Sequence, residues 1–225
     1  MAMRSEATIE RDHYFNRRYL KRERMVSFIE QIELVKRFAP EGATILEVGR
    51  GNGFVDGFLR TYLDYPVTTV DINADLEPDI VDDITNPARL QPDSYDVVTC
   101  FEVLEHMPFE QACAAVATLC GVARRHVLLS VPDMRYFITG SLTVFGTLPV
   151  FFRRMLSTSR WRNKNKTFGD DHYWEVGITV DGREYSEAAV REGLFGGRRL
   201  EADYRCFDVP WHHYYAVAAG DATHA

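Results

Sequence analysis

Residues 45–53 read Ile-Leu-Glu-Val-Gly-Arg-Gly-Asn-Gly, which is the most informative segment of the chain. Its apolar start predicts a short buried strand, and the residues from about 52 to 62 have the pattern of an amphipathic helix. Glycine is needed where the backbone takes positive φ or must lie against a ligand. A strand, a glycine turn and a helix N-terminus together form a corner that binds nucleotides.

The spacing of the glycines separates two kinds of nucleotide site. A dinucleotide fingerprint has the form G-x-G-x-x-G. Gly49 and Gly51 fit its first two positions, but Phe54 stands where the third glycine is required, and the next glycine is Gly53. The sequence therefore disfavours an NAD-dependent dehydrogenase.

Four further segments follow the glycine turn in a regular order. They are residues 67–71 (VTTVD), 79–84 (DIVDDI), 94–106 (SYDVVTCFEVLEH) and 125–132 (RHVLLSVP). Together with the glycine turn, they resemble, over residues 44–132, the motifs of the class I S-adenosylmethionine-dependent methyltransferases. Residues 101–106 (FEVLEH) are similar to the segment found in ubiquinone-type and glycan- or lipid-modifying members.

The resemblance implies an α/β fold with a doubly wound, mostly parallel seven-stranded sheet and an insertion after strand five. The alternation of strand and helix patterns up to Pro132 agrees with it. We expect one methyltransferase domain over residues 1–225, with an N-terminal helical extension at 1–40 and an acceptor-side insertion or lid at 133–182. Helices are expected at residues 24–38, 108–122 and 186–195, and two closing strands at 199–207 and 211–219.

The resemblance also implies S-adenosylmethionine as the cofactor. The glycine turn would bring backbone amides to the methionine carboxylate and the ribose, and Glu47 would lie near the amino group. Asp71 would accept hydrogen bonds from the ribose hydroxyls, and Asp83 from the adenine amino group. The full set implied is Glu47, Gly49, Gly51, Gly53, Asp71, Ile72, Asp83, Ile84, Cys100 and Phe101. Arg50 departs from the family, which usually has a small or neutral residue between the first two glycines.

Methyl transfer needs the acceptor atom, the methyl carbon and the sulfur in line, and a hydroxyl acceptor also benefits from a general base. The candidate catalytic residues are His106, which follows the fourth motif, and His172, which lies in an aromatic and acidic run at residues 169–175 (GDDHYWE). Each has a structural alternative: His106 as a helix-start residue bonded to backbone, and His172 as part of a packing loop. His212 and His213 lie on a strand pattern and are expected to be structural.

Glu102, Glu105 and His106 have the spacing of one helical face, which is a possible Mg²⁺ or Zn²⁺ arrangement. Acids at a helix start are favoured without any metal. The sequence therefore predicts no metal ligand.

Composition describes an ordinary globular protein of 225 residues with a net charge of −7. The four cysteines form no C-x-x-C pair, which favours reduced thiols and a cytoplasmic location. The charge is uneven, because residues 134–169 contain seven basic residues and no acidic one. The acidic remainder argues against nucleic acid as a partner.

An uncharged run at residues 136–152 (YFITGSLTVFGTLPVFF) stands just before most of these basic residues. It is short for a membrane span and is interrupted by glycine and proline. Two interpretations stay open: a segment that lies peripherally on an anionic membrane, or a lid over the acceptor pocket with a solvated basic run.

The functional hypothesis is methyl transfer to a small-molecule or lipid-like, amphipathic acceptor. The absence of an Asn-Pro-Pro-Tyr-like element after the fourth motif favours an oxygen or carbon acceptor atom. The alternative hypothesis is a binding protein of methyltransferase fold without turnover. The acceptor's identity and the oligomeric state stay open.

Overall fold

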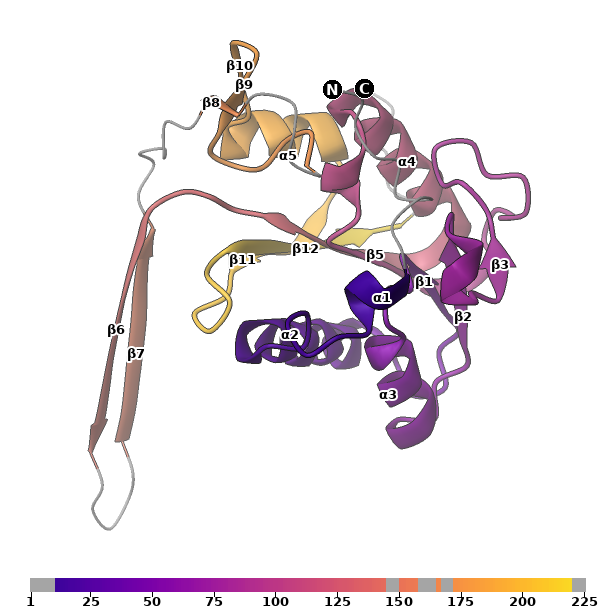
Figure 1. Cartoon of the computed structure of the whole chain (residues 1–225), viewed down its shortest axis with the longest axis horizontal. Helices are drawn as coiled ribbons and strands as arrows, with labels where there is room; N and C mark the ends of the chain where they lie inside the picture. The colour runs from indigo at the N-terminus through magenta and orange to yellow at the C-terminus, as the bar shows by residue number, and fades with distance from the viewer. Residues whose placement is uncertain (1–10, 145–149, 158–164, 167–171, 220–225) are drawn as a thin grey trace.

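The computed structural model describes residues 11–144, 150–157, 165–166 and 172–219, and a seven-stranded sheet forms its centre (Figure 1). In their order across the sheet, the strands are β11 (Leu200–Arg205), β12 (His212–Ala218), β5 (Ala123–Pro132), β4 (Tyr95–Phe101), β1 (Ile45–Val48), β2 (Val67–Asp71) and β3 (Ile80–Val81). Neighbouring strands are parallel except at the β11–β12 and β12–β5 pairs. The predicted seven-stranded, mostly parallel sheet is confirmed.

Helices cover both faces of the sheet. One face carries α2 (Arg22–Phe38) and α3 (Phe54–Tyr62), and the other carries α4 (Phe109–Val122) and α5 (Glu187–Phe195) (Figure 1). Alternate residues of β1 separate the two cores, since Ile45 packs in the cluster of α2 and α3 while Leu46 packs in that of α4 and α5. A short helix, α1 (Arg11–Tyr14), precedes α2.

The last helix shows how local sequence sets an element's bounds. Ser186 is the N-cap of α5, and its hydroxyl accepts a hydrogen bond from the backbone N–H of Ala189 at 3.0 Å. Gly196 follows the last turn with a φ of +51°, a conformation that glycine adopts at low cost.

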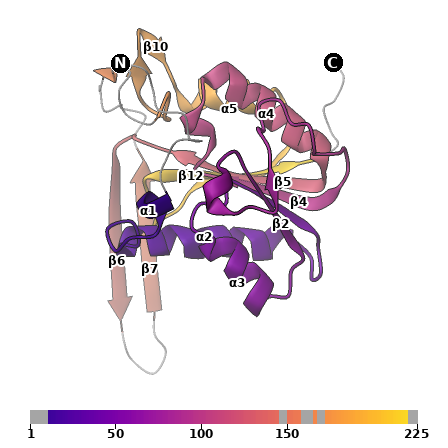
Figure 2. The same cartoon turned by 45° about the vertical axis from the view of Figure 1, so that its right-hand side comes forward.

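The segment after β5 forms a hairpin that projects from the body of the molecule (Figures 1 and 2). Its strands are β6 (Phe137–Val144) and β7 (Val150–Ser157), which pair antiparallel with each other. A small separate sheet follows, made of β8 (Asn165–Lys166), β9 (Thr179–Val180) and β10 (Arg183–Glu184). Ile138 and Leu142 on β6 are 68% and 62% exposed, so these two side chains are not buried against the sheet. None of the helices in the described ranges is long and apolar enough to cross a membrane.

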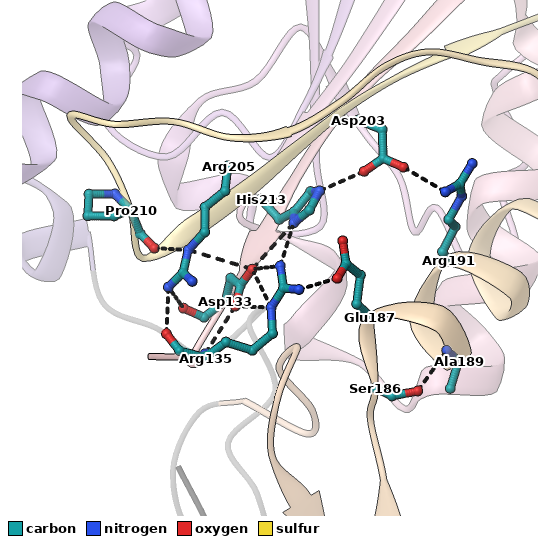
Figure 3. Close-up of polar contacts among 10 residues, drawn as sticks. All are labelled: Asp133, Arg135, Ser186, Glu187, Ala189, Arg191, Asp203, Arg205, Pro210 and His213. Atoms are coloured by element: carbon teal, nitrogen blue, oxygen red, sulfur yellow. Dashed lines mark hydrogen bonds and ion pairs between the residues drawn. The ribbon is translucent and has the colours of Figure 1, made fainter. Parts of the chain in front are cut away.

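A buried ion network stands at the base of this hairpin (Figure 3). Asp133 directly follows β5 and is 1% exposed, and its carboxylate accepts hydrogen bonds from Nε of Arg135 at 3.0 Å and from Nη2 at 2.6 Å. His213 lies between two carboxylates, with Nδ1 3.3 Å from Asp133 and Nε2 2.8 Å from Asp203. Arg205 donates to the backbone carbonyls of Asp133 and Arg135.

The network fixes the protonation of its members. Burial alone would raise the pKa of Asp133, but the hydrogen bonds from His213 and Arg135 lower it to about 2. Burial acts against the charged form of His213, but the two carboxylates prevail and raise the pKa of the imidazole. Arg135, counted among the basic residues of the insertion, is therefore a buried partner of Asp133 and Glu187 and not a surface cation.

Candidate functional site

The glycine turn follows β1 at the carboxyl edge of the sheet. Gly49 has a φ of +80°, and its N–H donates to the carbonyl of Val70 at 2.9 Å. A Cβ on Gly49 would lie 2.3 Å from Cγ2 of Val103, so only glycine fits there without movement. Gly51 and Gly53 also have positive φ, of +54° and +71°, and Gly53 is the N-cap of α3.

Glu47 on β1 is buried beneath this turn, and its Oε2 has no hydrogen-bond partner among the described residues. Burial, followed by the repulsion of Asp56, raises the pKa of Glu47 well above its ordinary value. A buried carboxylate oxygen of this kind fits a ligand that brings a positively charged donor, such as an ammonium group. Arg50 does not fill that place: it bonds the carbonyl of Leu76, and its Nε lies 3.8 Å from Oδ2 of Asp56.

Two acidic residues lie at the carboxyl ends of the next two strands, at the same edge of the sheet. Asp71 ends β2, and one of its oxygens accepts a hydrogen bond from the N–H of Asn73 at 2.9 Å. Asp83 follows β3 and accepts from the N–H and the hydroxyl of Thr85 at 2.8 and 2.7 Å. Ile84, beside it, is 7% exposed and offers an apolar surface.

One cavity of about 640 Å³ joins these residues to a second group of polar side chains. Of the ten residues predicted to bind a cofactor, eight line it: Glu47, Gly49, Gly51, Asp71, Ile72, Asp83, Ile84 and Phe101. Gly53 and Cys100 do not; Gly53 shapes the start of α3, and Cys100 is completely buried in the core. The cavity extends past Phe101 to His106, His172 and His212.

His106 and His172 come together in this second half. Their rings meet edge to face, with centroids 4.8 Å apart, and Nδ1 of His172 lies 2.7 Å from Oε1 of Glu175. Glu105 is 1% exposed, and burial raises the pKa of its carboxyl group. Glu105, His106 and His172 offer ligand atoms within 4.8 Å of one another, so these residue types are also able to hold a divalent cation.

Glu102 does not share a face with Glu105 and His106, contrary to the spacing argument. Only a 3₁₀ turn, η3 (Leu104–His106), follows β4, and Glu102 has a φ of +57° that turns its side chain toward α2. There its Oε1 accepts from the hydroxyl of Ser27 at 2.7 Å and from Nε2 of Gln31 at 3.1 Å. Arg24 forms an ion pair with the other oxygen.

A model of the family described as "Methyltransferase domain" matches residues 14–173. The chain belongs to this family. Membership confirms the resemblance seen in the motifs and favours an enzyme over a binding protein of the same fold. No curated protein matches the methyltransferase in sequence.

Solved structures share the fold of this methyltransferase at low identity. A protein from Pyrococcus horikoshii OT3 has a TM-score of 0.59 and 13% identity, and the match covers 94% of this chain and all (100%) of that one. Magnesium protoporphyrin IX methyltransferase from Synechocystis PCC 6803 has a TM-score of 0.57 and 16% identity, over 88% and 84% of the two chains. A Burkholderia thailandensis N-methyltransferase has a TM-score of 0.54 and 12% identity, over 87% and 79%.

Sequence reasoning missed the α2 side of the methyltransferase's cavity. Arg24, Gln31 and His212 line it, although the sequence predicts only a helix at residues 24–38 and a structural role for His212. The one available signal was Gln31, a polar side chain among the apolar positions of α2 that is only 4% exposed. A buried polar residue on a core-facing helix needs partners, and here the partners are Ser27 and Glu102.

Proposed function

We propose that the methyltransferase transfers the methyl group of S-adenosylmethionine to an oxygen or carbon atom of a small or amphipathic acceptor. The observation that carries this proposal is one continuous cavity, in which a glycine turn and two acidic strand ends adjoin a cluster of histidines and carboxylates. Its volume of about 640 Å³ is in the usual range for small-molecule sites.

The residues of the first half fit the cofactor group by group. The unpartnered oxygen of Glu47 supports its proposed contact with the ammonium group, and the positions of Gly51 and Asp71 along the cavity support contacts with the methionine carboxylate and the ribose hydroxyls. When bound, S-adenosylmethionine supplies the methyl group: the acceptor atom bonds to the carbon while the carbon–sulfur bond breaks and its electron pair stays on sulfur. The Synechocystis structure described above holds S-adenosylhomocysteine, the product of such a transfer.

The second half supports an acceptor of modest size. His106 and His172 are the predicted catalytic residues, and they line the part of the cavity beyond Phe101. Two structural neighbours act on small molecules by their names, one on magnesium protoporphyrin IX and one on 1,6-didemethyltoxoflavin. A cavity of this volume, lined by side chains from α2, η3 and residues 172–175, suits an acceptor of this kind better than a macromolecule.

Transfer of a labelled methyl group tests the proposal directly. Wild-type protein, incubated with methyl-labelled S-adenosylmethionine and an organic extract of small molecules, is expected to yield a labelled extractable product. Gly49→Val is the matched inactive variant, because its side chain would overlap Val103. Label that stays entirely on the cofactor with every extract, despite measurable cofactor binding, would favour the binding-protein alternative.

We also propose that the β6–β7 hairpin contacts an anionic membrane surface, so that the acceptor is lipid-like. Tyr136, Ile138 and Leu142 are large and exposed on a hairpin that projects from the body (Figure 2). Arg153 and Arg154 pair in register with Ser141 and Gly140 of β6, which puts basic positions on the same hairpin. Apolar residues next to basic ones suit an interfacial segment. Phe145, Leu148, Arg160, Arg162 and Lys164, which belong to the same hypothesis, lie outside the described residues.

Vesicle co-sedimentation is expected to show binding to anionic vesicles and none to neutral ones. Each basic residue near such a surface contributes about 1 kcal/mol. Binding is expected to vanish at 1 M salt, where the Debye length is about 3 Å. Charge reversal at Arg153, Arg154, Arg160 and Arg162 is expected to abolish it while cofactor affinity stays unchanged. The matched control reverses Arg124 and Arg125, at the far end of β5. Wild-type protein that stays in the supernatant would contradict the proposal.

A further inference from the structure

His212 lines the cavity, although the sequence predicts only a structural role for this residue. It is the first residue of β12 and pairs in register with Pro132, the last residue of β5, so it stands at the same sheet edge as the glycine turn. Its side chain is 11% exposed and lines the cavity. His213, the next residue, faces the other side of the sheet and belongs to the buried network of Figure 3.

One ring nitrogen of His212 is held from the protein side. Nδ1 lies 3.4 Å from the hydroxyl oxygen of Ser27 and 3.5 Å from Oε1 of Glu102. Because both neighbours are oxygens and one is a carboxylate, they favour the tautomer with the proton on Nδ1. Nε2 makes no hydrogen bond within the described part of the chain, and in this tautomer it carries a lone pair.

The surroundings of His212 and Glu102 favour a neutral imidazole and an ionised carboxylate. The side chain of Glu102 is only 12% exposed, and this desolvation disfavours its charge, yet His212, Arg24 and Ser27 together lower the pKa of its carboxyl group. Burial lowers the pKa of His212, assisted by Arg24 and His172 and opposed by Glu102 and, more weakly, by Asp133. At neutral pH an ionised carboxylate therefore orients a neutral imidazole, as a general base requires.

The backbone supports a functional purpose for Glu102. Its φ of +57° is unusual for a residue with a side chain, and such conformations persist only where the surroundings impose them. The turn that results takes Glu102 away from Glu105 and His106 and directs it to His212 and α2. The cavity thus has two imidazole–carboxylate pairs, His172 with Glu175 and His212 with Glu102.

We propose that His212, oriented by Glu102 and Ser27, is the general base for a hydroxyl acceptor, an inference that rests on the proposed function. The acceptor hydroxyl donates its hydrogen bond to Nε2. As the oxygen forms its new bond to carbon, its proton passes to Nε2, and the resulting imidazolium returns that proton to water after the product leaves. The His106–His172 pair then contacts the remainder of the acceptor. This assigns the substrate class as a phenol or alcohol.

Nuclear magnetic resonance of the histidine side chains tests this with the whole protein, labelled with ¹⁵N at histidine and saturated with S-adenosylhomocysteine. Phenol serves as the hydroxyl probe. His212 is expected to be neutral at pH 7 with its proton on Nδ1, and phenol is expected to shift its Nε2 resonance. His212→Asn is expected to weaken phenol binding about tenfold, the loss of one buried hydrogen bond, and to leave S-adenosylhomocysteine affinity unchanged. His126→Asn, at a histidine paired with Glu201 outside the cavity, is the matched control.

The results for phenol binding separate a role of His212 from a role of the other two histidines. Phenol shifts confined to His106 and His172, or no shift at any histidine, would overturn the role of His212. So would a His212→Asn variant that binds phenol as wild type does. Glu102→Gln keeps the shape of the side chain and removes its charge, so a smaller population of the Nδ1-protonated tautomer in that variant supports the pairing. Failure of S-adenosylhomocysteine to bind would instead refute the proposed function, and calorimetry measures that separately.

Discussion

Asp133→Ala is expected to lower the free energy of unfolding by about 3–5 kcal/mol, the usual loss when one partner of a buried ion pair is removed. The carboxylate is 1% exposed, and Arg135, Arg205 and His213 all lie against it. Without it, Arg135 and Arg205 keep their positive charges at a buried site that has lost its central carboxylate. Denaturation in urea, with circular dichroism as the probe, measures the change.

A matched control is available at an exposed ion pair. Glu110 pairs with Arg183, and its side chain is 70% exposed, so Glu110→Ala is expected to cost less than about 1 kcal/mol. If Asp133→Ala cost no more than this control, the network would not stabilise the fold.

The same network sets the pH dependence of stability. His213 has a raised pKa in the folded protein, so its contribution is complete below the unfolded value of about 6.5 and is lost as the pH rises through the folded value. Asp133 has a pKa of about 2, so its contribution is complete above the unfolded value and is lost as the pH falls toward 2. Stability of the wild type is therefore expected to fall on both sides of a plateau, and Asp133→Asn is expected to flatten the profile.

Asp71→Ala is expected to weaken the binding of S-adenosylmethionine by about 1.5–3 kcal/mol, roughly ten- to a hundredfold, because two ribose hydroxyls lose a charged acceptor. Titration calorimetry on both proteins measures it. Asp75→Ala is the matched control, since Asp75 is exposed, lies four positions along the chain and does not line the cavity. Equal affinities of wild type and Asp71→Ala would place the ribose contact elsewhere and undermine the motif assignment.

The sequence predicted the features that repeat a local physical rule. Glycines at alternate positions after an apolar strand have few uses besides a tight turn at a ligand, and the left-handed backbone of Gly49, Gly51 and Gly53 agrees with that reasoning. Strands buried on both faces and helices with one apolar side are equally visible in a sequence. The α2 and α3 bounds accordingly differ from the predicted ones by two residues at most.

What the sequence could not show depends on contacts between distant segments or on one unusual dihedral angle. A periodicity argument assumes a helix, so it placed Glu102 with Glu105, whereas one residue with positive φ separates them. His212 joins Ser27 across 185 positions of the chain, a distance that no motif spans. Arg135 was predicted only as one of seven basic residues, because two of its partners, Glu187 and His213, lie 52 and 78 positions along the chain.

The hydrogen bonds between Glu102 and α2 determine where a truncated fragment of this protein can begin. The motifs alone suggest that a minimal unit begins at β1, near residue 44. Yet Arg24, Ser27 and Gln31, which hold the carboxylate behind His212, all come from α2. A fragment cut before β1 would keep every motif and leave a buried carboxylate without its donors. The smallest functional fragment therefore starts before α2. A fragment bounded by the motifs alone would lack the donors to Glu102.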